Sequence, residues 1–77
     1  MLRKGQKLKF RTLRARHGTS GPNATIERGR DGVYQFIVHY ADADDWMRCD
    51  SFAECVSRAT YWSAMHGYYL MEKEDQR

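Results

Sequence analysis

The most constraining feature of the chain is residues 33–40, VYQFIVHY, in which side chains alternate with the period of an extended strand. Tyr34, Phe36, Val38 and Tyr40 fall on one face, which is strongly aromatic, whereas the other face is mixed. This combination is typical of a central strand in an antiparallel sheet that is covered on one side only. The segment therefore needs a second layer, supplied by another part of the chain, to bury its aromatic face.

The covering layer is predicted at residues 51–67. Ser51 and Glu54 have the spacing of a capping box, in which side chains satisfy the free N–H groups at a helix start. Gly67 is a typical C-terminal stop. Between them, the residues with the spacing of one helical face are mainly apolar: Phe52, Cys55, Val56, Ala59 and Trp62, followed by His66.

The remaining segments predict further strands separated by turns. Strands are expected at residues 7–16, 24–28, 46–49 and 68–72, and turns at residues 17–23, 29–32 and 41–45. The sequence thus predicts a single α+β domain over residues 1–77. Its antiparallel sheet has about four to five strands, with one amphipathic helix packed on one face.

The first predicted strand contains an irregularity. Leu8 and Phe10 alternate with basic residues, but Leu13 and Ala15 fall on the opposite parity. A phase slip of this kind predicts a bulge or a local twist within residues 7–16.

Length and composition narrow the class of function. A chain of 77 residues buries only about 60% of its unfolded surface, so it has little room for an enclosed substrate cavity. No apolar run reaches the length of a membrane span, and the basic N-terminus lacks the apolar stretch of a secretory signal. We find no pattern of nucleophile, base and oxyanion donor. The sequence therefore predicts a cytoplasmic, non-enzymatic protein without a cofactor.

The net charge of +3 conceals an asymmetry. Residues 1–30 hold nine Lys or Arg and one Glu, whereas residues 31–77 hold four Lys or Arg and nine Asp or Glu. The two parts could neutralise each other across a small sheet. Alternatively, the asymmetry suggests an anionic partner, a protein surface of mixed charge, or self-association.

The acidic segment at residues 41–45 has three interpretations: a solvated turn, a metal site or a contact surface. Carboxylates are suitable calcium ligands, but the segment lacks the glycine, the length and the closing glutamate of a calcium loop, so no metal is predicted. As a contact surface, carboxylates could engage an Arg/Lys groove of a protein that handles nucleic acid. The predicted partner-binding residues are Asp42, Asp44, Asp45 and Trp46.

The basic first strand supports an alternative, in which the chain is a small nucleic-acid-binding module. Its candidate phosphate-binding residues are Lys7, Lys9, Arg11, Arg14 and Arg16. Tyr34, Phe36 and Tyr40 could then stack on bases. The competing interpretation is that these aromatic residues form the core beneath the helix.

Cysteine and histidine provide no specific signal. Cys49 and Cys55 are too far apart for a typical zinc pair, and Cys55 fits a small buried residue on the helix. His66 is expected to act as a cation at the helix C-terminus. Tyr61 and Met65 lie off the main apolar stripe, which predicts either a wide stripe or a partner surface. A monomer and a homodimer, through the outer helix face or an edge strand, both remain open.

The pattern SF-x-E-C-V-x-x-A-x-x-W-x-x-x-H-G-Y, at residues 51–68, is a capped helix that leads into a strand. Together with the preceding strands, this architecture is similar to small phage-encoded inhibitors of the anti-CRISPR type. The resemblance implies a non-enzymatic protein that binds a CRISPR effector complex and blocks target DNA binding. We therefore expect a phage- or mobile-element-encoded inhibitor that acts in a bacterial host by steric and charge occlusion of a protein or ribonucleoprotein complex that handles nucleic acid. It carries over no functional residues.

Overall fold

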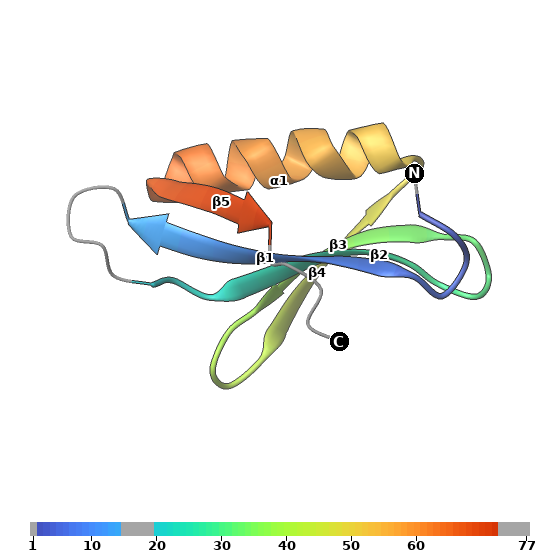
Figure 1. Cartoon of the computed structure of the whole chain (residues 1–77), viewed down its shortest axis with the longest axis horizontal. Helices are drawn as coiled ribbons and strands as arrows, with labels where there is room; N and C mark the ends of the chain where they lie inside the picture. The colour runs from blue at the N-terminus through green and yellow to red at the C-terminus, as the bar shows by residue number, and fades with distance from the viewer. Residues whose placement is uncertain (1, 15–19, 73–77) are drawn as a thin grey trace.

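The computed structural model describes residues 2–14 and 20–72. The elements in chain order are β1 (Lys7–Arg14), β2 (Asn23–Arg28), β3 (Tyr34–His39), β4 (Asp44–Cys49), α1 (Phe52–His66) and β5 (Tyr68–Glu72). The five strands form one antiparallel sheet, and α1 packs on one of its faces (Figure 1). The predicted α+β fold is confirmed.

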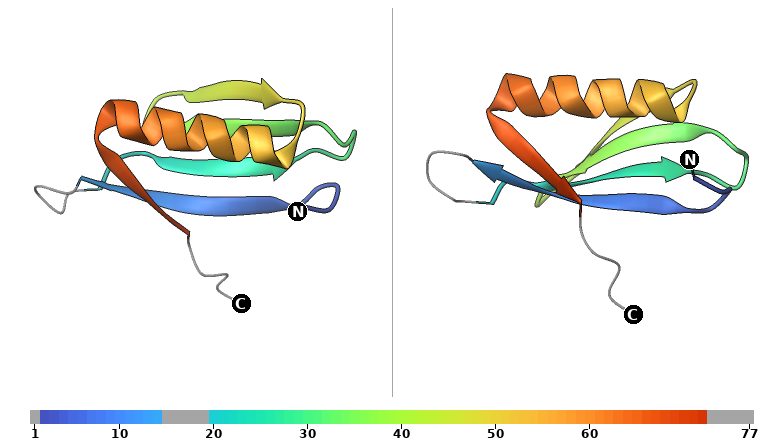
Figure 2. Two further views of the ribbon diagram at one scale, coloured as in Figure 1. Left: turned by 90° about the horizontal axis from the view of Figure 1, so that it is seen from above. Right: turned by 45° about the horizontal axis from the view of Figure 1, so that its top comes forward.

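The strand order in the sheet is β4-β3-β2-β1-β5, with every pairing antiparallel. The first four strands form a meander, because strands that follow one another in sequence also lie side by side in the sheet. After β4, helix α1 crosses back over the sheet, and β5 then pairs with the free side of β1 (Figure 2). The two edges of the sheet are therefore β4 and β5.

The core lies between the sheet and α1. Phe36 and Val38 are fully buried, and the ring of Phe36 meets that of Trp62 edge-on at 6.0 Å. Tyr34 is buried as well and makes an edge contact with Phe52. The interpretation of these strand aromatics as core residues is confirmed for β3. Tyr40, which follows β3, is 40% exposed.

Both predicted helix ends are confirmed. The backbone N–H of Glu54 donates to Ser51 Oγ at 3.1 Å, and Gly67 adopts a left-handed conformation with φ of 70°. The Glu54 carboxylate accepts from the backbone N–H of Asp50, one residue before the cap, at 2.6 Å. This bond extends the cap into the β4–α1 connection and fixes the direction in which the helix leaves the sheet.

The prediction for residues 7–16 was a bulge or a local twist, and no extra residue is found on β1 itself within the described residues. On the other side of the strand the pairing shifts by one residue between Phe10↔Ala24 and Leu13↔Ser20, with the extra residue within residues 20–24. From Phe10 to Arg14, β1 pairs one to one with β5, so its side chains alternate without interruption. Leu13 lies on the face away from α1, opposite Tyr69. Thr12 takes the buried position under the helix and satisfies its hydroxyl by donating to the Pro22 carbonyl at 2.8 Å.

Candidate binding face of the sheet

One face of the sheet packs on α1, and no helix or strand within residues 2–14 and 20–72 covers the other. We call this second surface the open face. Strand register and side-chain alternation assign its members. They are Lys7, Lys9, Arg11 and Leu13 on β1, Asn23, Thr25 and Glu27 on β2, Gln35, Ile37 and His39 on β3, Asp44, Trp46 and Arg48 on β4, and Tyr69 and Met71 on β5.

The basic residues predicted to bind nucleic acid divide into three groups. Lys7, Lys9 and Arg11 lie in a row on the open face, and all three are exposed. Arg14 lies on the helix side instead, with its guanidinium carbon 5.4 Å from the centre of the Tyr68 ring. Such a cation–π contact stabilises that edge of the core and removes Arg14 from the row. Arg16 lies outside the described residues.

The three basic side chains of β1 are regularly spaced and take part in none of the described ion pairs, so they are available to a ligand. Alternate residues along a strand are about 7 Å apart, so the three cations follow β1 at regular intervals. The ion pairs within residues 2–14 and 20–72 are His39–Asp44 and Arg58–Glu54, and neither involves β1. The single carboxylate opposite the row is Glu27, which accepts a hydrogen bond from Thr25 at 2.9 Å.

The predicted acidic cluster is dispersed by the fold. The turn predicted at residues 41–45 is shorter, because Asp44 and Asp45 already belong to β4 and pair with His39 and Val38. Consecutive strand residues point to opposite faces, so Asp44 lies on the open face and Asp45 on the helix side. Asp42 remains at the bend of the hairpin. The three carboxylates are exposed, but they do not share one surface.

Asp44 already has a partner within the sheet. Its Oδ1 lies 3.0 Å from Nδ1 of His39 on the neighbouring strand. Nε2 of the same imidazole lies 3.0 Å from the hydroxyl of Thr25 on β2. A chain of polar contacts therefore crosses the open face from β4 to β2 and holds Asp44 in position.

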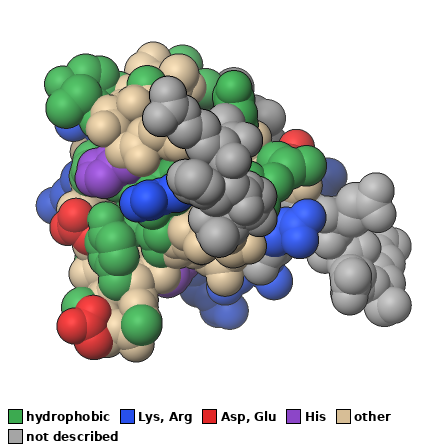
Figure 3. Space-filling view, turned by 90° about the vertical axis from the view of Figure 1, so that its left-hand side faces the viewer, with side chains coloured by type: hydrophobic (Ala, Val, Ile, Leu, Met, Phe, Trp, Pro, Cys, Tyr) green, Lys and Arg blue, Asp and Glu red, His purple; other side chains and the backbone are tan. Residues whose placement is uncertain are grey.

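The surface charge is mixed on the end of the molecule shown in Figure 3. In the described part of that view, acidic and basic side chains are interspersed with hydrophobic ones rather than gathered into one large area of a single sign.

Trp46 is the one apolar residue among the four predicted contact residues, and the structure leaves it exposed. It is 62% exposed and lies on the open face at the edge of the sheet. Its neighbour across the β3–β4 pair is Ile37, which is only 4% exposed although it belongs to the same face. The open face thus has an apolar centre beside an exposed indole.

Two residues of the open face were missed by the sequence analysis. Tyr69 is 64% exposed and Met71 is 45% exposed, and they pair with Leu13 and Arg11 of β1. Alternation within residues 68–72 separates them from Tyr68 and Leu70, which pack against the core. That signal is present in the sequence, but it becomes useful only when β5 is known to lie beside the basic strand.

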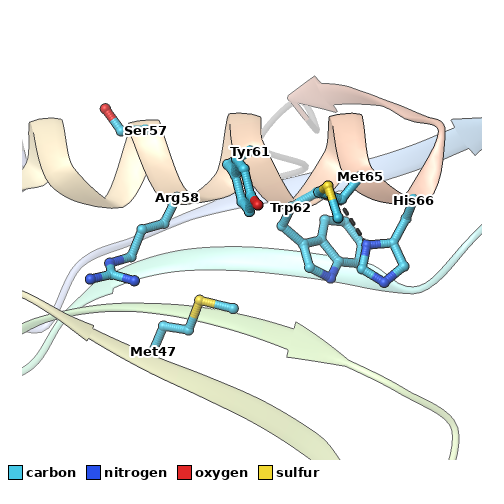
Figure 4. A pocket seen from close by; sticks show the side chains of 7 residues that line it. All are labelled: Met47, Ser57, Arg58, Tyr61, Trp62, Met65 and His66. Carbon is cyan, nitrogen blue, oxygen red and sulfur yellow. Dashed lines mark hydrogen bonds between the residues drawn. The ribbon is translucent and has the colours of Figure 1, made fainter.

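A shallow apolar groove of about 430 Å³ lies on the helix side, between α1 and β4. Its lining residues are Met47, Ser57, Arg58, Tyr61, Trp62, Met65 and His66 (Figure 4). Tyr61 and Met65 are 69% and 66% exposed, so they form a second apolar face of the helix and do not extend the core. The wide-stripe interpretation is therefore wrong for Tyr61 and Met65, and the partner surface stays a prediction.

The two cysteines lie in the core, and His66 contacts the backbone of its own helix. Cys49 and Cys55 are buried and free, as expected for Cys55. Burial, followed by a hydrogen bond with Cys49, raises the pKa of the Cys55 thiol to about 12, so it is not a thiolate at neutral pH. Nδ1 of His66 lies 2.9 Å from the Trp62 carbonyl near the helix end. Within the described ranges, no three His, Cys, Asp or Glu side chains converge to hold a metal ion.

The chain matches no protein-family model, no curated protein and no solved structure. Across residues 2–14 and 20–72, α1 is too short and too polar to span a bilayer.

Proposed function

We propose that this protein acts by binding and not by catalysis, and that its open face binds a single-stranded nucleic acid. One observation carries the proposal: Lys7, Lys9 and Arg11 form an exposed row, free of the described ion pairs, on an uncovered sheet face. Tyr69 lies beside that row with 64% of its surface exposed.

The chemistry of the two residue types is complementary. Lys and Arg side chains neutralise phosphates and release counterions, which gives affinity without sequence preference. An exposed aromatic ring adds stacking, because every base has a π-face. Of the stacking residues expected from the sequence, Tyr34 and Phe36 are buried beneath α1, and Tyr40 is 40% exposed but follows the end of β3, away from the basic row. In the proposal, Tyr69 takes the stacking role beside that row.

The basic row is tested by charge reversal. Lys7→Glu, Lys9→Glu and Arg11→Glu together should weaken binding to a fluorescent oligothymidylate at least about tenfold. With three phosphate contacts, the wild-type slope of log affinity against log salt is about −2, and it should approach zero in the variant. Fluorescence anisotropy over a salt series measures both quantities.

The control carries the same change in net charge at exposed loop positions. Arg3→Glu, Lys4→Glu and Arg30→Glu should retain most of the affinity. If the two triple variants bound equally well, net charge would account for the binding and the β1 row would have no specific role.

Stacking has its own test. Tyr69→Ala should cost about 1–3 kcal/mol of binding free energy, whereas Tyr61→Ala, on the helix side, should leave affinity unchanged. An unaltered affinity for Tyr69→Ala would remove this residue from the site.

A second candidate is a protein-binding inhibitor that blocks a nucleic-acid-handling complex of a bacterial host. The observation that favours it is Trp46, because an exposed indole at a sheet edge is a typical hot spot of protein interfaces. Asp42, Asp44 and Asp45 would then supply charge around it. Affinity capture from bacterial lysate, with and without nuclease, separates the two candidates. A stoichiometric protein partner that survives nuclease, and is lost with Trp46→Ala, would favour the inhibitor.

A further inference from the structure

The edge strand β4 offers unpaired backbone groups to another strand, and its charged side chains limit which strand can pair with it. It pairs with β3 alone, so the backbone groups on its outer side have no strand partner within residues 2–14 and 20–72. Its six residues, DDWMRC, include no Pro and no Lys, and its register with β3 has no bulge. Pro, Lys and bulges are three of the features that block exposed edges; charged side chains are another, and β4 has Asp44, Asp45 and Arg48, so a strand that pairs with it must complement these charges.

We infer that β4 pairs antiparallel with β4 of a second copy, about a two-fold axis that passes midway between the Trp46 residues of the two copies. In this arrangement, residues directly opposite each other have numbers of equal parity and lie on the same face. On the open face, Asp44 lies opposite Arg48 of the second copy, Trp46 opposite Trp46, and Arg48 opposite Asp44. The sequence of β4 is therefore complementary to itself in both charge and apolar character.

The charges also select the register. A shift of two residues in one direction would place Asp45 opposite Asp45 of the second copy. The same shift in the other direction would place Asp44 opposite Asp50. Like charges directly opposite each other destabilise a strand pair, whereas opposite charges stabilise it. The register centred on Trp46 is the one that pairs opposite charges on both sides.

The helix side of the junction is compatible with this register. Met47 of one copy lies opposite Asp45 of the other, beside the groove between α1 and β4. Arg58 lines that groove and extends toward the strands near Met47 (Figure 4). Arg58 already pairs with Glu54 at 3.2 Å, and its guanidinium has further N–H donors for a second carboxylate, that of Asp45 from the other copy.

The other edge strand, β5, is not complementary in charge to a second copy of itself. β5 carries a single charged residue, Glu72, so pairing with its own copy gives no opposite-charge pair. Pairing of β4 with β5 of another copy would be head-to-tail and would continue as an open chain of molecules. Self-pairing of β4 closes after two copies, which is why we commit to a two-fold dimer.

The dimer does not depend on the proposed nucleic-acid binding. It joins two five-stranded sheets into one continuous sheet and places both open faces, with their basic rows, on the same side. It also accounts for the exposure of Trp46, because the two indoles would cover each other at the junction.

The decisive experiment exchanges charges across the axis. In a dimer of Asp44→Arg with itself, the new arginine would lie opposite Arg48 of the second copy. In a dimer of Arg48→Asp with itself, the new aspartate would lie opposite Asp44. Each variant alone should therefore sediment as a monomer of 9.1 kDa. Mixed in equal amounts, the two variants should form a dimer, because both cross-strand pairs are then Arg–Asp. Wild type should sediment at twice the chain mass, and Lys7→Glu, an exposed change away from β4, should not alter this. A monomeric wild type, or dimers of both single variants, would overturn the inference.

A cross-link tests the register without changing any charge. Trp46→Cys places one thiol on each side of the axis, at the Cα separation that a disulfide requires. Mild oxidation should convert this variant to a covalent dimer, whereas Lys9→Cys, on the same face but on β1, should stay monomeric on a denaturing gel. Equal cross-linking of the two variants, or none for Trp46→Cys, would contradict pairing centred on Trp46.

Discussion

At the residue scale, Gly21 lies at a tightly packed point, against Thr12 of β1 and Tyr68 of β5. A Cβ atom added at Gly21 would lie 2.5 Å from the Thr12 hydroxyl oxygen and 2.6 Å from carbons of the Tyr68 ring. Gly21→Ala therefore forces these side chains apart and should lower the free energy of unfolding by about 1–3 kcal/mol. Urea denaturation measures the loss. Ser20→Ala, at the exposed neighbouring position, is the control and should be nearly neutral.

Also at the residue scale, Cys55 makes the free energy of unfolding depend on pH. Its pKa is about 12 in the folded protein, raised chiefly by burial, against an ordinary value of 9.0. A thiol with a raised pKa stabilises the fold at pH below 9.0, and this contribution is lost as pH rises from about 9.0 toward 12. Cys55→Ala should therefore show a shallower decline of unfolding free energy in that range. Parallel curves for variant and wild type would show that Cys55 does not cause the decline.

At the element scale, α1 depends on a cap that is specified locally. Ser51 Oγ accepts from the backbone N–H of Glu54, which would otherwise lack a partner at the helix start. Ser51→Ala should reduce the free energy of unfolding by about 1 kcal/mol. Ser57→Ala, an exposed position within the same helix, controls for loss of a hydroxyl and should have little effect. Thermal melts followed by circular dichroism would compare the three proteins.

The elements also explain which parts of the site were predictable. Parity within β1 was readable from the sequence for Lys7, Lys9 and Arg11, but the predicted phase slip wrongly kept Arg14 in the same row, although it lies on the helix side. Parity between strands was not, because it depends on hydrogen-bonded register across the sheet. Asp44 and Asp45 were therefore treated as one cluster with Asp42, although β4 sends them to opposite faces. Tyr69 was missed for the same reason, since β5 meets β1 only after the helix has crossed the sheet.

At the scale of the whole molecule, stability rests on a small core. A chain of 77 residues has a total stability of about 4–11 kcal/mol. Phe36→Ala removes the largest fully buried side chain and should cost about 3–5 kcal/mol, which is a large part of that total. We expect a strongly shifted or lost urea transition. Tyr61→Ala, at a position that is 69% exposed, should stay within about 0.5 kcal/mol of wild type.

The sequence by itself determined the features that depend on near neighbours. These are the alternation of residues 33–40, the capped helix that ends at Gly67, and the aromatic core between them, because periodicity and capping are local properties of the chain. Tertiary structure decided which side chains share a surface. The open face joins residues of β1 and β5 that are more than fifty positions apart, and it separates consecutive aspartates. Strand order, register and the side on which α1 packs are set by burial over the whole chain, and no local pattern contains them.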